Sequence, residues 1–430
     1  MAAALRPLKL AGFPPLAFAY VVNELGDWLG SVALAVLVFD QTGSPLATAA
    51  LFLAAQFLPA LLVPAIVARL EALHPRRSLP VLYAGEAVAF VALAALADGF
   101  ALAAVIAIAA VDGALAGSGR ALTRATAGAV ISPAGLLREG NAILNIGFTV
   151  GAAAGPAIGG VLVAGAGVQV ALLADAASFL IVALLLATAG RLPRPDPEAA
   201  NWAQRLRNGL AYVRKRPMVG LLLGAETAAF LFGAAVIPIE VIFAKETLDA
   251  GDAGYGALLT SWGVGMVAGS MIFAAIRRRS LRLLLAVSAA AIGVSYAAAG
   301  LAPTLFLACL AFVVGGAGNG VQWVALISAL QELSRPVMHA RVIALLESGT
   351  SAMLGVGFLF GGVLTSLTST RVTFVAAGAG VLAVIAIAIA LARRLPWEPD
   401  TGIGPSAEPL SARPADAHRP PDLSPQPEQP

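Results

Sequence analysis

Two carboxylic acids lie within one turn of an apolar stretch near the start of the chain. The segment VVNELGDWLG, residues 21–30, places Glu24 and Asp27 inside an apolar run over residues 13–39. Each ionised acid at mid-depth in a bilayer costs about 2.5 to 3.5 kcal/mol, so its presence needs a reason. The i, i+3 spacing puts both carboxylates on one helix face, where they could exchange a proton or hold a cation.

Other ionisable residues lie in later apolar runs. Asp112 and Arg120 are separated by about 12 Å along one helix, and their expected role is either a structural salt bridge or contact with a substrate. Glu226 lies within LLLGAETAAF, residues 221–230. Weaker candidates of the same kind are Glu86, Asp175, Glu347 and Glu240, the last close enough to a helix end to be solvated.

The composition is that of a membrane protein. Hydrophobic residues make up 59% of the 430 residues and charged residues only 12%, whereas soluble domains carry about 25% charged residues. The mean hydropathy of +0.87 agrees with this class. The single cysteine, Cys309, can form neither an intrachain disulfide nor a thiolate metal site.

The sequence lacks the motifs of an enzyme. It contains no GxxxxGK[ST] phosphate loop, no HExxH pair and no paired Cys/His metal spacing. The three histidines, His74, His339 and His418, fall in expected loops or in the tail, so no nucleophile and base meet at bilayer depth. We therefore predict no enzymatic activity, no cofactor, no metal and no nucleic-acid partner, with an ion gradient as the source of energy.

Apolar runs long enough to span a bilayer recur along the chain. They predict an all-α integral membrane protein with transmembrane helices over residues 14–39, 46–68, 79–98, 101–121, 141–164, 169–190, 218–244, 254–276, 282–301, 304–330, 342–366 and 372–392. Alternate connections carry the basic residues, with Arg120 and Arg124 assigned to the connection after the fourth helix. Because positive charge stays inside, both termini are expected in the cytoplasm and the protein in the plasma membrane.

The longest connection divides these helices into two sets of six. The expected organisation is an N-terminal six-helix bundle over 1–190, a cytoplasmic basic linker over 191–217 and a C-terminal six-helix bundle over 218–394. The linker is expected to carry an amphipathic segment over about 201–213 on the membrane surface. The proline-rich tail over 395–430 shows no apolar periodicity and is predicted to be disordered.

The two halves share an internal repeat. GFTVGAAAGPAIGG at 147–160 aligns with GTSAMLGVGFLFGG at 349–362, and four glycine pairs match at a constant offset of 202 residues. The competing interpretation is that membrane helices are rich in glycine anyway. The same offset relates Glu24 to Glu226, so we predict two acids at equivalent depths that face one cavity, or, alternatively, acids that only bond a neighbouring helix. Asp27 has Ala229 at its repeat position.

Two motifs carry a resemblance to a known family. Over about residues 14–394 the chain resembles the major facilitator superfamily, in which two halves alternate access to a central site. GAAAGPAIGG at 151–160 looks like the GxxxGPxxGG signature of its drug:proton antiporters, which implies that Gly151, Gly155, Pro156, Gly159 and Gly160 help to close the transport pathway. The alternative is a small-residue packing face. Residues 24–65 look like the start of the macrolide and siderophore exporters, with Gly-Asp and Gly-Ser on the first helix and QFLP on the second.

The loop after the second helix departs from the family pattern. The family usually reads like GxLaDrxGRR there, whereas this chain has VARLEALHPRR at 67–77, without the leading glycine and with Pro75 inserted. The resemblance implies a cytoplasmic gate in which Glu71 stands for the acid and Arg76 and Arg77 for the basic pair. The alternative is that these charges only set the topology.

The predicted function is proton-coupled export of amphiphilic small molecules by a monomer in a lipid bilayer. Glu24, Asp27, Glu226, Asp112 and Arg120 are the candidate coupling and cavity residues. The wall of the cavity could be supplied by Gln56, Gln322, Trp28, Trp262, Trp323 and Phe230. Alternatives are an importer or facilitator of a metabolite or lipid on the same fold, and a non-transporting receptor or scaffold.

Overall fold

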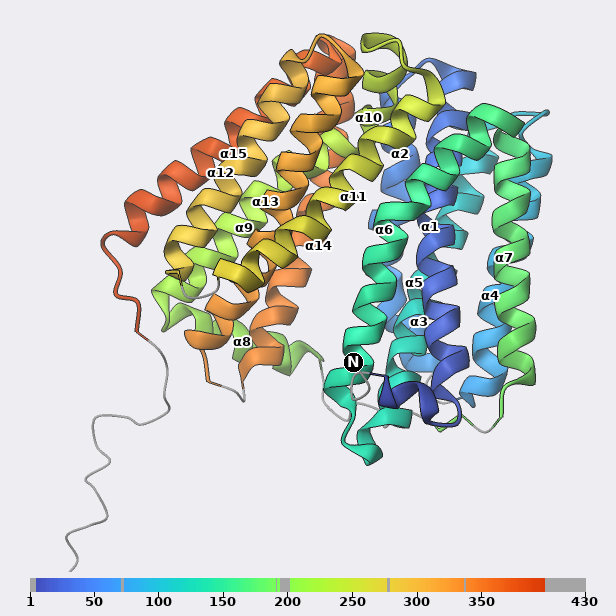
Figure 1. Cartoon of the computed structure of the whole chain (residues 1–430), viewed down its shortest axis with the longest axis horizontal. Helices are drawn as coiled ribbons and strands as arrows, with labels where there is room; N and C mark the ends of the chain where they lie inside the picture. Colours follow the sequence, from blue (N-terminus) through green and yellow to red (C-terminus); the bar gives the residue numbers. More distant parts are fainter. Residues whose placement is uncertain are drawn as a thin grey trace, which may run out of the picture.

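Helices account for all of the regular structure in the part of the chain that can be placed. A computed structural model describes residues 5–70, 73–190, 192–193, 202–276, 279–335 and 338–398 (Figure 1). Twelve spans within these residues are long and apolar enough to cross a membrane. The predicted number of transmembrane helices is therefore confirmed for the described residues.

The first six spans come from the N-terminal half of the chain. Their elements are η1 (Arg6–Lys9), α1 (Phe13–Thr42), α2 (Pro45–Phe52), η2 (Leu53–Phe57), α3 (Leu58–Leu70), α4 (Pro75–Ala95), α5 (Leu102–Ile131), η3 (Ser132–Ala134), α6 (Leu137–Ala166) and α7 (Val168–Thr188). We call α1–α7 the first group.

The last six spans follow α8 (Trp202–Arg214), a helix that coincides with the amphipathic segment expected at about 201–213. Their elements are α9 (Pro217–Val236), η4 (Ile237–Ile239), α10 (Glu240–Ile242), η5 (Phe243–Thr247), α11 (Gly251–Ile276), α12 (Leu281–Leu301), α13 (Leu305–Glu332), α14 (His339–Leu367) and α15 (Thr370–Ala392). We call α9–α15 the second group. Most of the predicted tail, residues 399–430, lies outside the described residues.

The largest difference from the predicted helices is at α5. Its end was expected at residue 121, but the helix continues to Ile131, so Arg124 lies inside the helix rather than in a connection, and Arg120 lies in the interior of the helix rather than at its end. The physical reason is that both guanidinium groups find partners within the protein. Arg124 Nε donates to Tyr20 Oη at 2.9 Å, and its guanidinium carbon lies 5.0 Å from the centre of the Tyr20 ring. Such a cation–π contact offsets the cost of placing the charge inside the bundle.

Short polar residues cap the start of three of the helices. Ser44, Thr304 and Ser369 cap α2, α13 and α15, and each side-chain oxygen accepts a hydrogen bond from a backbone N–H three residues later. At the end of α1 the chain turns through Gly43 in the left-handed region, with φ of 58°. A glycine suits this turn because a Cβ would be strained there.

Two of the spans are interrupted helices. In the second span, the π-helical segment η2 separates α2 from α3 and contains Gln56. In the seventh span, α9 gives way to the 3₁₀ turn η4, the short α10 and the π-helical η5. Helix interruptions at membrane depth are tolerated where the backbone is buried in protein or lines a cavity, so both spans are candidates for the functional site.

Each group of helices packs mainly within itself. In the first group α1 packs on α6 and α7, and α4 packs on α7; in the second group α9 packs on α14 and α15, and α12 packs on α13 and α15. Figure 1 shows α1, α4, α5 and α7 on the right and α9, α12, α13 and α15 on the left. The division of these groups into two moving bundles stays a prediction.

The two groups meet through one half of their length. We call the helix ends that carry Arg76, Arg214 and Arg393 the basic end; the N-terminus and α8 lie there, at the bottom of Figure 1. Contacts between the groups are formed by α6 with α11 and by α2 with α14. The close approaches of Gly160 to Gly256 and of Gly362 to Ala49 place these contacts toward the opposite end (Figure 1). Gly160, near the end of α6, faces Gly256, near the start of α11. The groups are therefore joined at the end away from the basic residues.

Candidate functional site

Arg120 of α5 is paired with two acids of α1. Its Nη1 lies 3.7 Å from Glu24 Oε1, and its Nη2 lies 3.2 Å from Asp27 Oδ2. Both carboxylates can reach the same guanidinium group because an i, i+3 pair shares a helix face. The expected common face of Glu24 and Asp27 is present, and it points toward α5.

The two acids differ in their surroundings. Asp27 Oδ2 also accepts a hydrogen bond from Asn23 Nδ2 at 2.7 Å, and the Asp27 side chain is 19% exposed. Glu24 is fully buried, and neither of its carboxylate oxygens has a hydrogen-bond partner among the described residues. A buried charge is tolerated only when it is paired, so Glu24 depends on Arg120.

Asp112 lies near this cluster without an ion pair of its own. We use "first cavity" for a space of about 440 Å³ between α1, η2, α3 and α5, which Glu24, Asp27, Asp112 and Arg120 line. Arg120 turns toward α1 rather than along α5, and Asp112 forms no ion pair with another described residue. The expected structural salt bridge of Asp112 is therefore wrong, and its carboxylate remains available to the cavity.

Two further acids surround α1 on other sides. Glu86 of α4 and Asp175 of α7 are both buried, and both carboxylate oxygens of Glu86 lack a hydrogen-bond partner among the described residues. A Cβ at Gly26 or Gly30 would lie within 2.6 Å of an Asp175 carboxylate oxygen. The glycines of the Gly-Asp and Gly-Ser pairs thus make room for Asp175 beside α1.

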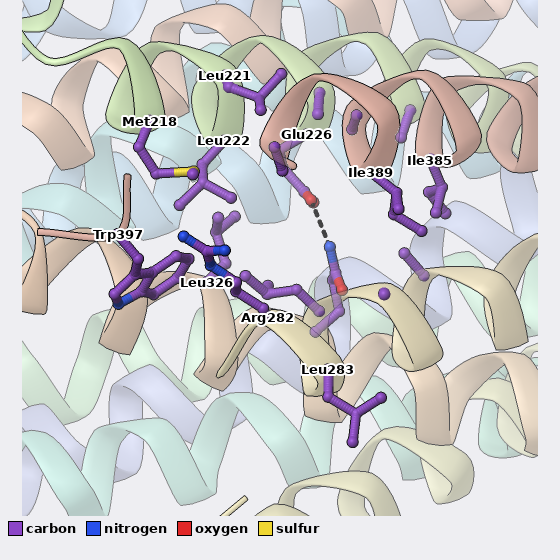
Figure 2. Close-up of a pocket in the computed structure, with 18 of the residues that line it drawn as sticks. Met218, Leu221, Leu222, Glu226, Arg282, Leu283, Leu326, Ile385, Ile389 and Trp397 are labelled. Atoms are coloured by element: carbon purple, nitrogen blue, oxygen red, sulfur yellow. Dashed lines mark hydrogen bonds between the residues drawn. The ribbon is translucent and has the colours of Figure 1, made fainter. Parts of the chain in front are cut away.

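Glu226 of α9 has a neutral partner instead of an arginine. Gln322 Nε2 of α13 donates to Glu226 Oε2 at 2.9 Å, as Figure 2 shows, and Gln322 Oε1 accepts from Ser288 Oγ of α12 at 2.5 Å. Ser288 thereby orients the amide of Gln322 so that its N–H points at Glu226. The three side chains come from three different helices, and the hydrogen bonds between them fix their relative geometry.

An apolar side pocket leads from this carboxylate toward the basic end. It has a volume of about 320 Å³ and lies between α9, α12, α13 and α15, with Leu222, Leu326 and Ile389 among its walls (Figure 2). Arg282 and Trp397 also line it, and the Arg282 guanidinium carbon lies 5.2 Å from the centre of the Trp397 ring. Glu226 is the single acidic residue among the described residues of this pocket.

The internal repeat relates the two buried constellations residue by residue. At the offset of 202 residues, Glu24 corresponds to Glu226 and Arg120 to Gln322. Glu86 stands at the position of Ser288, but it forms no hydrogen bond with another described residue, whereas Ser288 bonds Gln322. The first group thus carries an ionic version of the constellation, and the second group a neutral one. Applying the offset to Arg120 and Glu86, as well as to Glu24, would have identified Gln322 and Ser288 from the sequence.

Glu24 and Glu226 do not face one cavity, contrary to the prediction. We use "central cavity" for a space of about 400 Å³ that is lined by both groups, and Glu226 lines it whereas Glu24 lines the first cavity. The two acids diverge because Glu24 points toward Arg120 and Glu226 toward Gln322, each within its own group. Residues that line both cavities, and so connect them, are Trp28, Ser31, Gln56 and Phe148.

The predicted aromatic and amide wall is present around the central cavity with one exception. Its lining includes Gln56, Gln322, Trp28, Trp262 and Phe230. Trp323 is not part of the lining, since its side chain is 48% exposed. Because neighbouring residues on a helix point about 100° apart, Gln322 and Trp323 cannot both face the cavity.

The glycine motif of α6 packs on the acid-bearing helix. A Cβ at Gly151 would lie 2.7 Å from Glu24 Cβ, and one at Gly155 would lie 2.6 Å from Trp28 Cβ. Gly159 continues the same stripe against Leu29. The stripe therefore lets α6 approach α1 closely at the position of Glu24, as expected for small residues spaced by four.

The last glycine of the motif faces the other group. Gly160 packs on the Cα of Gly256, and a Cβ at Gly256 would lie 2.7 Å from the carbonyl oxygen of Pro156. Its repeat partner Gly362 packs on Ala49 of α2, which again belongs to the other group. In both halves this glycine sits where the groups meet.

The predicted gate loop can be placed only in part. Arg76 and Arg77 are exposed in the first turn of α4 at the basic end, whereas Glu71 lies outside the described residues. The exposed arginines fit a role in topology as well as one in gating, so the gate stays a prediction.

Comparisons with known proteins identify the family. The family model described as "Transmembrane secretion effector", of the major facilitator type, matches residues 2–417. No curated protein matches the chain. Among solved structures, the nucleoside transporter NupG is 14% identical with a TM-score of 0.69, covering 89% of this chain and 99% of its own.

Two other solved transporters share the fold. A mutant of the peptide transporter POT in complex with sulfate is 13% identical with a TM-score of 0.73, covering 90% of this chain and 95% of its own. A bacterial homologue of the human lysosomal transporter Spinster, in an inward-facing and occupied conformation, is 15% identical with a TM-score of 0.69, covering 89% and 96%. At such low identity these similarities show the fold alone. This chain is a multi-pass membrane protein, and it belongs to the transmembrane secretion effector family of major facilitator superfamily transporters.

Proposed function

We propose that this transporter exports amphiphilic small molecules from the cell in exchange for protons, as in the drug:proton antiporter branch that its glycine motif resembles. The observation that carries the proposal is the pairing of Arg120 with Glu24 and Asp27 beside a cavity. One guanidinium group cannot compensate two carboxylates, so protonation of one acid restores neutrality. Protonation can therefore be linked to a change in the packing of α1 against α5.

The contacts between the two groups support alternating access. The groups are joined at the end away from the basic residues, through α6 with α11 and α2 with α14. If the basic end faces the cytoplasm, as the positive-inside rule favours, the cavities of this conformation face inward. Rocking of the two groups as halves would then expose the central cavity to the outside.

The proposed cycle follows from this arrangement. Cargo enters from the cytoplasm while Glu24 or Glu226 is ionised. The groups then rock, the outer end opens, and a proton from outside binds an acid as cargo leaves. The protein acts as a monomer in the plasma membrane with both termini inside, and the proton gradient replaces any cofactor. A membrane potential adds about 2.3 kcal/mol per charge per 100 mV to such a cycle.

Neutralising the coupling acids tests this function. A drug-susceptibility panel with and without the gene first identifies a cargo, whose uptake is then followed in inside-out vesicles with and without a proton uncoupler. Glu24→Gln and Glu226→Gln are each expected to lower uncoupler-sensitive uptake by at least about tenfold, since each removes a proton-binding carboxyl from its cavity. The amounts of inserted protein should stay equal.

Glu347→Gln is the matched control, because Glu347 lies exposed on α14 and should not affect uptake. Undiminished uptake by both single variants and by the double variant would remove these acids from the mechanism. Accumulation of the cargo by intact cells under the same gradient would favour an importer. Absence of any exchange or counterflow would favour the receptor or scaffold alternative.

A further inference from the structure

Glu240 is a buried acid to which the proposed cycle gives no role. It begins the three-residue α10, between the 3₁₀ turn η4 and the π-helical η5 of the seventh span. The expectation that it is solvated is wrong, since it is only 7% exposed. It lies well inside the span because this interrupted helix continues to Thr247 before the chain turns.

No described residue compensates the carboxylate of Glu240. It forms no hydrogen bond or ion pair with another described residue. The nearest lysine in the sequence, Lys245, instead donates to Asp40 and Asp252. An acid buried without a partner is costly, and inside a membrane protein such a group commonly serves a ligand or an ion.

Glu240 shares the lining of the central cavity with aromatic residues. Tyr255, Trp262 and Tyr296 line this cavity together with Glu240. Trp262 and Tyr296 are stacked, with ring centroids 5.4 Å apart and an angle of 6° between the ring planes. The faces of Trp and Tyr rings attract cations, and this attraction strengthens where water is excluded.

The charge of the lining favours a cation over an anion. Glu226 also lines the central cavity, about 20 Å before Glu240 along the seventh span. Arginine, lysine and histidine are all absent from the described residues of this lining, whereas Arg120 lines the first cavity. The two cavities therefore differ in chemistry: the first holds an arginine beside its acids, whereas the acids of the central cavity can receive positive charge only from a bound molecule or from protons, as far as its described lining goes.

We propose that the central cavity binds an organic cation, such as an amine or a quaternary phosphonium, with its positive group against Glu240 and its apolar body among Trp262 and Tyr296. Glu240 is thus a cargo-binding residue, at a site separate from the Glu24–Asp27–Arg120 cluster. This inference rests on the proposed function, because it names the class of cargo that the exporter carries. Binding itself needs no proton gradient, so it can be tested apart from transport.

Equilibrium binding of radiolabelled tetraphenylphosphonium to the purified full-length protein in nanodiscs provides the test, with empty nanodiscs subtracted. Methyltriphenylphosphonium should displace the probe, whereas triphenylphosphine oxide, a neutral molecule of nearly the same shape, should compete at least about tenfold less well. Glu240→Gln should weaken probe binding by at least about tenfold, which corresponds to about 1.4 kcal/mol. Glu240→Asp, which keeps the charge, should retain most of the affinity.

Two further variants separate this role from a structural one. Trp262→Leu should also weaken binding, and Glu347→Gln should leave it unchanged. Equal affinity of Glu240→Gln and the unaltered protein would overturn the proposal, and so would equal competition by the neutral oxide. The competition result needs only the unaltered protein, so it decides the matter even if Glu240→Gln does not fold. If the unaltered protein binds the phosphonium probe but shows no proton-driven uptake of it, that result would contradict the proposed function alone.

Discussion

Arg120→Gln is expected to abolish transport. The guanidinium group of Arg120 lies 3.7 Å from Glu24 and 3.2 Å from Asp27, and it is the single positive charge among the described residues that line the first cavity. Removing one partner of a buried pair costs about 3 to 5 kcal/mol, because the other charge is left uncompensated. The Arg120 side chain is 38% exposed, so the loss of stability should fall below that range.

The choice of glutamine comes from the repeat. Gln322 occupies the equivalent position in the second group and donates to Glu226 at 2.9 Å, so an amide fits this place in the constellation. Arg120→Gln therefore changes the charge more than the packing. Uncoupler-sensitive uptake in inside-out vesicles should drop by about a hundredfold, while the protein still inserts.

A second substitution should partly restore the stability that Arg120→Gln removes. Asp27→Asn added to Arg120→Gln removes one of the two uncompensated acids, so the melting temperature of the double variant should exceed that of Arg120→Gln. Arg124→Gln is the matched control, because Arg124 lies one turn later on α5 and its described partners, Tyr20 and Asn145, are neutral. Equal losses for Arg120→Gln and Arg124→Gln would show that the ion pairs have no special role.

Gly160→Leu is expected to block transport by a different route. A Cβ added at Gly160 would lie 2.8 Å from the Cα of Gly256, a backbone atom that cannot move aside as a flexible side chain could. Overpacking of this kind costs about 1 to 3 kcal/mol. The strain arises where α6 of the first group meets α11 of the second, so it destabilises the conformation in which this end is joined.

Labelling from outside the cell measures this change. With Cys309 replaced by serine, a cysteine introduced at Ile237, which lines the central cavity, should react faster with an impermeant maleimide when Gly160→Leu is present. Gly165→Leu is the control, because Gly165 lies in the same helix with no atom within 4 Å of an added Cβ. Unchanged labelling together with normal uptake would show that this contact does not close the pathway.

The helices of this protein could be predicted from the sequence because hydrophobic length is a local property. A run of apolar residues must satisfy its backbone hydrogen bonds internally, so it becomes a helix whatever its neighbours are. Hydrophobic length predicted the twelve spans. The amphipathic pattern over about 201–213 predicted α8. The main error concerns the end of α5. Arg120 and Arg124 were assigned to an aqueous connection, whereas their ion-pair and hydrogen-bond partners lie on other helices of the protein.

The internal repeat predicts more about the buried polar residues than the composition does. It related Glu24 to Glu226, and the structure adds Arg120 with Gln322 and Glu86 with Ser288 as pairs at the same offset. The glycines that match between the halves also pack on matching helices, since Gly147 packs on Val21 of α1 and its repeat partner Gly349 packs on Thr227 of α9. An offset is visible in the sequence because both halves keep the same order of helices.

What the sequence established was where the acids lie along their helices and which of them are equivalent. Which side of the helix each acid faces, and what it meets there, emerged only in the folded chain. Glu24 turns to Arg120, Glu226 turns to Gln322, and Glu240 remains buried without a described partner beside Tyr255 and Tyr296. Helix rotation and tilt follow from packing against every neighbouring helix at once, and nearly uniform apolar faces leave no periodic trace of them in the sequence.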